Sequence, residues 1–176
     1  MKKIIPVLLF CCISLGLSAQ TQNKISSYLF AQFTNTIYDQ TLGNNPWGMG
    51  FGIQAFLNNK TKFKPSIELT GDVYLADDKV ARFNGDGNLI DDVPAMVNFF
   101  IGSSYQAGNN IYLSFLAGPS FMNGKTLFGI KPSAGYYFSK NKRWTAKISI
   151  INIFNRNKPS KEDFGSISFA LGVKLF

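Results

Sequence analysis

Apolar and polar side chains alternate strictly between residues 47 and 57. The odd positions are almost all large and apolar, and they are Trp47, Met49, Phe51, Ile53, Ala55 and Leu57. The even positions are mostly small or polar, and they are Gly48, Gly50, Gly52, Gln54 and Phe56. Because successive side chains of a strand point to opposite faces, this segment predicts a strand with one continuous apolar face.

The same period of two returns in seven further segments of the chain. They lie near residues 25–35, 62–74, 95–105, 111–121, 128–138, 144–150 and 166–175. One face of each is apolar, whereas the other carries Lys, Glu, Gln, Ser, Thr or Gly. An apolar exterior around a polar interior is typical of a β-barrel in a lipid bilayer. We therefore predict an all-β fold, an eight-stranded antiparallel up-and-down transmembrane β-barrel.

The predicted connections fall into two classes. Short, turn-like segments lie near 58–60, 106–110, 122–125 and 139–143, and longer ones near 36–46, 75–94 and 155–163. Apart from 122–125, short and long connections alternate, as in outer-membrane barrels with short periplasmic turns and long external loops. Aromatic residues near the strand ends predict interfacial girdles, and they are Tyr38, Trp47, Phe63, Phe138 and Trp144. Pro119 and Pro132 fall within strands, where we expect β-bulges.

The first residues have the organisation of a secretory signal peptide. Met1-Lys2-Lys3 is basic, residues 4–17 are apolar, and the small Ser18 and Ala19 follow. Cleavage is expected after Ala19, with cleavage after Ser18 as the alternative. Residues 1–19 are thus predicted to be the signal peptide and 20–176 the outer-membrane β-barrel domain. Both cysteines, Cys11 and Cys12, lie in the leader, so the mature domain has no disulfide.

The balance of charge is basic. The formal net charge of +8 falls to +6 when Lys2 and Lys3 are removed with the leader. Such a balance suits nucleic acid in a cytoplasmic protein, but an exported chain with lipid-facing strands argues against that partner. Nucleic acid is therefore not expected to bind.

The sequence offers little catalytic chemistry. It contains no histidine, so a serine nucleophile would have to use Lys131 or Lys147 as its base, with Ser114, Ser133 or Ser149 as nucleophile. We instead predict a non-enzymatic protein with no cofactor and no metal site. The acidic segment 75–94 includes Asn84-Gly85-Asp86-Gly87-Asn88, but Leu89 stands where a calcium-binding EF-hand loop requires glycine.

Charged residues on the inward faces are the candidate functional residues. Glu68, Lys131 and Lys147 are expected at similar heights in the lumen. The interior of an eight-stranded barrel is only wide enough for side chains, and buried charges there must pair. We predict a polar lumen cluster, which consists of Gln32, Gln54, Lys64, Glu68, Asn98, Lys131 and Lys147. It acts as a structural plug or, alternatively, as an ion gate. The lysines and Glu68 also argue against a soluble lipocalin-like carrier with an apolar cavity.

The chain resembles the small eight-stranded outer-membrane barrels typified by the OmpA transmembrane domain and OmpX. The resemblance rests on the strand–turn pattern, on Ala117-Gly118-Pro119-Ser120-Phe121, on Gly135-Tyr136-Tyr137-Phe138 and on Gly172-Val173-Lys174-Leu175-Phe176. It implies that Phe176 helps the barrel-assembly machinery to recognise the chain, although Phe176 is out of phase with the lipid-facing residues before it. It also implies that the family's enzymes, whose sites use a histidine base, have no counterpart here.

Two classes of function remain open at this stage. The first is a barrel in the cell outer membrane that contributes to envelope structure or surface interaction, in contact with membrane lipid and lipopolysaccharide. The basic residues Arg156, Lys158 and Lys161 are the candidate surface-loop contacts to lipopolysaccharide. The second is an outer-membrane component of a protein secretion or assembly system, with protein partners bound through its loops. A small gated pore is a further alternative.

Overall fold

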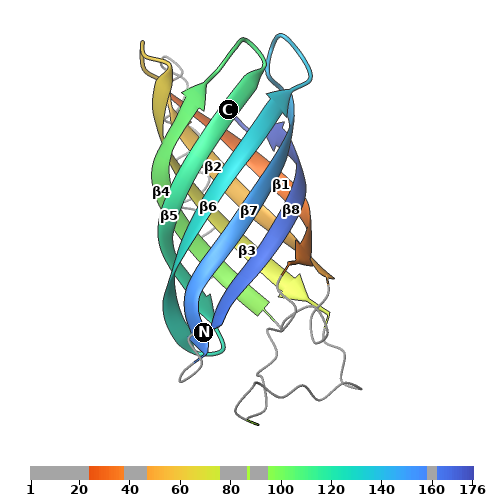
Figure 1. Cartoon of the computed structure of the whole chain (residues 1–176). Helices are drawn as coiled ribbons and strands as arrows, with labels where there is room; N and C mark the ends of the chain where they lie inside the picture. The colour runs from red at the N-terminus through yellow and green to blue at the C-terminus, as the bar shows by residue number, and fades with distance from the viewer. Residues whose placement is uncertain (1–23, 38–46, 76–86, 88–94, 158–161) are drawn as a thin grey trace, which may run out of the picture.

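The computed structural model describes residues 24–37, 47–75, 87, 95–157 and 162–176. Its eight strands are β1 (Ile25–Thr36), β2 (Trp47–Leu57), β3 (Phe63–Tyr74), β4 (Ala95–Gln106), β5 (Ile111–Met122), β6 (Lys125–Tyr137), β7 (Trp144–Asn157) and β8 (Glu162–Lys174). Each strand pairs antiparallel with its neighbour in sequence, and β1 pairs with β8 to close the barrel (Figure 1). The predicted all-β, eight-stranded fold is confirmed. Among the described residues, no helix is long and apolar enough to cross a membrane.

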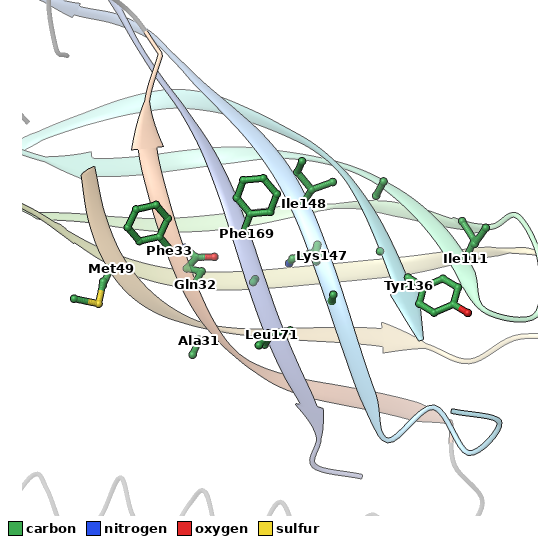
Figure 2. A pocket seen from close by; sticks show the side chains of 14 residues that line it. Ala31, Gln32, Phe33, Met49, Ile111, Tyr136, Lys147, Ile148, Phe169 and Leu171 are labelled. Carbon is green, nitrogen blue, oxygen red and sulfur yellow. The ribbon is translucent and has the colours of Figure 1, made fainter. Parts of the chain in front are cut away.

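The alternation of the sequence places apolar side chains outside the barrel. In β2, Phe51 is 69% exposed while Gln54 is fully buried. Figure 2 shows Phe33, Ile148 and Phe169 on the outer face of three adjacent strands, and the ladder pairs Phe33 and Ile148 each with Phe169. With neighbouring outward residues they border a groove of about 820 Å³. The outer face is thus a continuous apolar surface, whereas a water-soluble sheet would bury one apolar face and expose a polar one.

The inward glycines of β2 give room to large side chains of β3. Gly48 lies opposite Tyr74, Gly50 opposite Asp72, and Gly52 opposite Thr70. A Cβ atom on Gly50 would overlap the Asp72 carboxylate and the Gly71 carbonyl oxygen. Glycine at position 50 is therefore required by the close approach of a buried polar side chain.

The two ends of the barrel differ in their connections. At one end, called here the short-turn end, segments 58–62, 107–110 and 138–143 join the strands, and the first and last strands meet: Ser27 N donates to Phe176 O at 3.1 Å. At the other end, the tight turn of Asn123 and Gly124 has φ angles of 48° and 69°, the positive values of a type I′ hairpin turn. Phe176 itself lies beyond β8 and is 45% exposed.

The expected bulges at Pro119 and Pro132 do not form. The β4–β5 ladder keeps one register from Asn98↔Ser120 to Ile101↔Ala117, on either side of Pro119. The β6–β7 ladder does the same from Ile130↔Asn152 to Ser133↔Ser149, on either side of Pro132. Each proline faces outward and interrupts one ladder for two residues, so the missing N–H is accommodated without inserting a residue.

An irregularity does occur near the end of β7, where none was predicted. The register with β8 shifts between Ile153 and Asn157, and Asn155 adopts a positive φ of 57°. Asp163 binds the distorted segment and the residue that precedes Ile153, because its carboxylate accepts hydrogen bonds from Asn155 N at 3.0 Å and Asn152 Nδ2 at 3.1 Å. Residues 155–157 and 162–163, expected in a long loop, therefore belong to strands.

Several predictions lie outside the described residues. They concern the signal peptide, Tyr38, the acidic segment except for Leu75 and Gly87, and the loop lysines Lys158 and Lys161. Arg156 is a residue of strand β7. The other predicted girdle residues lie at strand ends and are exposed: Trp47 at the end opposite the short turns, and Phe63, Phe138 and Trp144 at the short-turn end.

Candidate functional site: the lumen

Three charged side chains from three strands meet in the middle of the lumen. Glu68 of β3 accepts a hydrogen bond from Lys131 Nζ of β6 on Oε1 at 2.6 Å, and from Lys147 Nζ of β7 on Oε2 at 2.8 Å. All three side chains are at most 2% exposed. Charge-assisted bonds of this length are among the stronger hydrogen bonds of proteins. The Glu68–Lys131–Lys147 group, called here the ion triad, links β3 to β6 and β7, neither of which is its neighbour in the sheet.

Further groups surround Lys147. Its Nζ also donates to Gln54 Oε1 of β2 at 3.0 Å, and it lies 4.2 Å from the centroid of the Phe30 ring. The amide oxygen and the ring face both favour a cation. Lys147 therefore has a carboxylate, an amide and an aromatic partner, which together compensate for loss of hydration.

A second buried carboxylate lies beside the ion triad in the same strand. Asp72 is 3% exposed, and its Oδ1 accepts a hydrogen bond from Gln32 Nε2 at 2.5 Å. Asp72 is not among the residues of the predicted lumen cluster, although its position four residues after Glu68 gives it the same inward face. With Asp72, the buried ionisable acids and lysines of the described lumen are equal in number: Glu68 and Asp72 against Lys131 and Lys147.

The remaining two predicted cluster residues have hydrogen-bond partners outside the ion triad. Asn98 is fully buried and donates through Nδ2 to Thr70 Oγ1 at 3.1 Å. Lys64 lies at the short-turn end of β3, where its Nζ donates to Asn58 Oδ1 at 3.2 Å. The structure thus brings together Gln54, Glu68, Lys131 and Lys147, places Gln32 with Asp72, and separates Lys64 from them.

Apolar side chains close the lumen on both sides of these charges. On the short-turn side, four rings contact one another in sequence around the lumen: Tyr28, Phe56, Tyr112 and Tyr137, with centroid separations of 5.0 to 5.7 Å. We call them the aromatic collar. On the opposite side, the buried apolar cluster comprises Tyr74, Met96, Phe100, Leu116, Met122, Ile151, Ile153 and Phe164. The alternation along the strands predicted that many of these residues point inward, but it did not predict that they form two layers.

The arrangement does not assemble a serine–lysine pair within the described residues. The amines of Lys131 and Lys147 point to Glu68, while Ser114 Oγ is hydrogen-bonded to Ser104 Oγ at 2.6 Å. The hydroxyls of Ser133 and Ser149 have no hydrogen-bond partner there. No group of three potential metal ligands is found among the described residues either. The chemistry present is charge pairing between side chains that fill the lumen.

Comparison with known proteins shows the fold of this chain but not its protein family. No protein-family model matches the chain, and no curated protein matches its sequence. Among solved structures, the outer-membrane protein Ail of Yersinia pestis in a nanodisc matches with a TM-score of 0.53 at 12% identity, covering 85% of this chain and 99% of that chain. Neisserial surface protein A matches with a TM-score of 0.51 at 11% identity, covering 86% and 97%.

A designed transmembrane β-barrel matches as well, with a TM-score of 0.50 at 8% identity, covering 85% of this chain and 95% of the design. Natural and designed chains thus share one architecture at identities that carry no functional information. The geometry and the comparisons together identify the fold of this chain as that of the small eight-stranded outer-membrane β-barrels.

Proposed function

We propose that the chain is a non-enzymatic integral protein of the cell outer membrane, exported by its predicted signal peptide at residues 1–19. The observation that carries this proposal is the apolar outer face of the closed barrel combined with a charged, filled interior. Lipid solvates such an exterior, whereas water would leave it exposed at a large cost in free energy. The role we propose is in envelope structure or surface interaction, and the barrel-assembly machinery would insert the chain.

Cell fractionation tests the location. The mature protein is expected in the outer-membrane fraction, extracted only by detergent and changing its mobility on gels when heated out of the folded state. Recovery of folded protein in the soluble periplasmic fraction would contradict the proposal, because an apolar barrel exterior cannot remain dispersed in water.

We propose that the lumen is a structural plug. One apolar layer lies on each side of the ion triad, and each ammonium of the triad has a carboxylate partner. A specific observation supports the alternative, a small gated pore: the triad crosses the lumen between β3, β6 and β7, so breaking it could open a path for ions. Conductance of triad variants, described in the Discussion, distinguishes the two.

Partners outside the membrane form a separate part of the proposal. Lipopolysaccharide would contact the basic end of β7 and the loop after it, through Arg156, Lys158 and Lys161, because anionic sugars and phosphates attract such a segment. Membership of a secretion or assembly system is the alternative function. Extraction in mild detergent followed by affinity purification separates them, because a system component is expected to co-purify with stoichiometric protein partners and an envelope barrel with lipopolysaccharide.

A further inference from the structure

A small polar pocket opens at the short-turn end of the lumen, next to the aromatic collar. Its volume is about 230 Å³, enough for several water molecules. Four of its lining residues are lysines, contributed by β3, by the β6–β7 turn and by β8: Lys64, Lys140, Lys142 and Lys174. None of the described residues that line it is Asp or Glu. The pocket therefore gathers positive charge without a carboxylate side chain in its wall.

The lysines are close enough to affect one another. The pKa of Lys142 is lowered, first by its partial burial and then by the positive charges of Lys64 and Lys174. The Lys142 ammonium is positioned over the Tyr137 ring, with Nζ 5.0 Å from the ring centroid. Tyr28, another collar residue, donates its hydroxyl hydrogen to the Lys142 carbonyl oxygen at 3.0 Å. Lys142 is thus held against the collar in spite of like-charge repulsion.

The backbone of Lys142 is unfavourable as well. Its φ of +54° lies in the left-handed region, where Gly and Asn are tolerated and other side chains are strained. Asparagine would adopt that conformation at lower cost, but the asparagine of this turn is one residue earlier: Asn141 Oδ1 accepts a hydrogen bond from Arg143 N at 3.2 Å. A strained position that also carries a repelled charge reduces the stability of the barrel, and such strain is concentrated at functional sites.

We propose that this pocket binds a phosphate-bearing anion through the ammonium groups of Lys64, Lys142 and Lys174. An ammonium is a compact point charge with three donors, which suits phosphate oxygens. A phosphate group can carry close to two negative charges, so it matches several converging lysines better than a single carboxylate does. The pocket accommodates one such group, but its volume is too small for an oligosaccharide or a folded peptide.

The phosphate could come from either of two sources. Short turns of outer-membrane barrels face the periplasm, so free phosphate compounds of that compartment reach the pocket directly. The headgroup of a phospholipid in the inner leaflet is the other source, because the pocket lies at the rim of the barrel. Both present the same chemistry to the three lysines.

Calorimetric titration of pyrophosphate into the barrel, folded in octyl glucoside at pH 7 and low ionic strength, tests the site. The wild type is expected to bind saturably with one molecule per barrel. The double variant Lys142→Asn with Lys174→Gln is expected to bind at least tenfold more weakly. The matched control is Lys60→Gln with Lys62→Gln, which removes the same charge from exposed lysines of the β2–β3 turn at the same end. The control is expected to bind like the wild type.

A stability measurement separates binding from folding. In the absence of phosphate, the double variant Lys142→Asn with Lys174→Gln is expected to keep or raise the urea midpoint, because Asn tolerates the left-handed backbone and the like-charge repulsion is removed. Weaker binding by an equally stable barrel supports a built site. Equal weakening by both double variants, or no saturable binding by the wild type, would overturn the proposal in favour of non-specific condensation on a basic surface.

Lipid nanodiscs distinguish the sources. If headgroups occupy the pocket, the apparent affinity for pyrophosphate is expected to fall in phosphatidylglycerol nanodiscs relative to octyl glucoside, by competition. If free phosphate compounds are the ligand, the two affinities are expected to agree within about twofold. With either source, the double variant Lys142→Asn with Lys174→Gln must bind pyrophosphate more weakly than the wild type, in octyl glucoside and in any nanodisc in which the wild type binds it.

Discussion

Among individual residues, the main physical problem of this lumen is the burial of charge. Removing an ion from water costs several kcal/mol, and only close, well-aligned partners compensate. Glu68 is bound by two lysines, Lys147 has three partners, and Asp72 accepts from Gln32. The pairing of each charge matters more to stability than the number of charges, because an unpaired buried ion cannot be neutralised by solvent.

Replacement of Glu68 by Gln tests this dependence. The change keeps the size of the side chain but leaves two buried ammonium groups without a carboxylate, so unfolding free energy is expected to fall by roughly 3–5 kcal/mol. Urea unfolding in lipid bilayers measures it. Adding Lys131→Met should recover part of the loss, because the two sites are coupled. Strictly additive losses would show that Glu68 and Lys131 do not act as a pair.

Gly50 provides a second test at a single position. Gly50→Ala places a Cβ against the Asp72 carboxylate and the Gly71 carbonyl, so a loss of about 1–3 kcal/mol is expected from overpacking. Gly71→Ala is the matched control, because a Cβ there meets no atom within 4 Å. It should be neutral in the same unfolding assay. Comparable losses at both positions would mean that strand propensity, not space, determines the effect.

The inward direction of the charged lumen residues was predictable from the alternation of side chains along each strand, but their contacts were only partly predictable. Glu68, Lys131 and Lys147 have inward positions and must pair in a narrow barrel, so their meeting follows from the sequence pattern. The aromatic collar does not follow, because the height at which Tyr28, Phe56, Tyr112 and Tyr137 meet depends on the stagger of four strands. The left-handed conformation of Lys142 is invisible as well, because lysine gives no signal for it.

Among the strands, prediction succeeded where the two faces differ in polarity. The bounds of β2 were predicted to the residue, because its apolar and small residues alternate at every position but Phe56. It failed in the second half of β7, where Ile150, Ile151, Ile153 and Phe154 are apolar on both faces and the period of two is lost. Inward apolar residues at that height belong to the apolar cluster, so the lost contrast has a structural cause.

Charge placed on the outer face tests the assignment of faces. Phe51→Arg or Ile148→Arg is expected to cost about 2–4 kcal/mol near the middle of the bilayer, because Arg there must leave water for hydrocarbon. Gln54→Arg should respond differently, since it is limited by space and by repulsion from Lys147. Unfolding in bilayers of two thicknesses measures depth dependence. The face assignment would be wrong if all three variants lost the same stability in both bilayers.

For the barrel as a whole, layering controls whether ions can pass. An ion entering from the short-turn end meets the lysine pocket, the aromatic collar, the ion triad and then the apolar cluster. Two of these layers consist mainly of apolar side chains, which cannot replace the hydration of an ion. Removal of the triad alone therefore leaves both barriers in place.

Conductance in planar bilayers checks this expectation. The wild type should show only small, irregular currents, and Glu68→Ala should lower stability without opening a steady current if the lumen is a plug. The control is Phe51→Ala, which alters the outer face only. A sustained ionic current from Glu68→Ala, with the Phe51→Ala barrel still closed, would instead establish the gated pore.

The ion triad also has a consequence for assembly. A strand inserted one residue out of register turns every side chain to the opposite face. Such a slip in β7 would move Lys147 into hydrocarbon without a partner, bring Ile148 towards the Glu68 carboxylate and leave Glu68 with Lys131 alone. Because Glu68, Lys131 and Lys147 belong to three strands, a single mispaired strand removes stabilisation from the other two. The buried charges thus favour the correct strand register, because barrels closed with a strand one residue out of register lose these charge pairs.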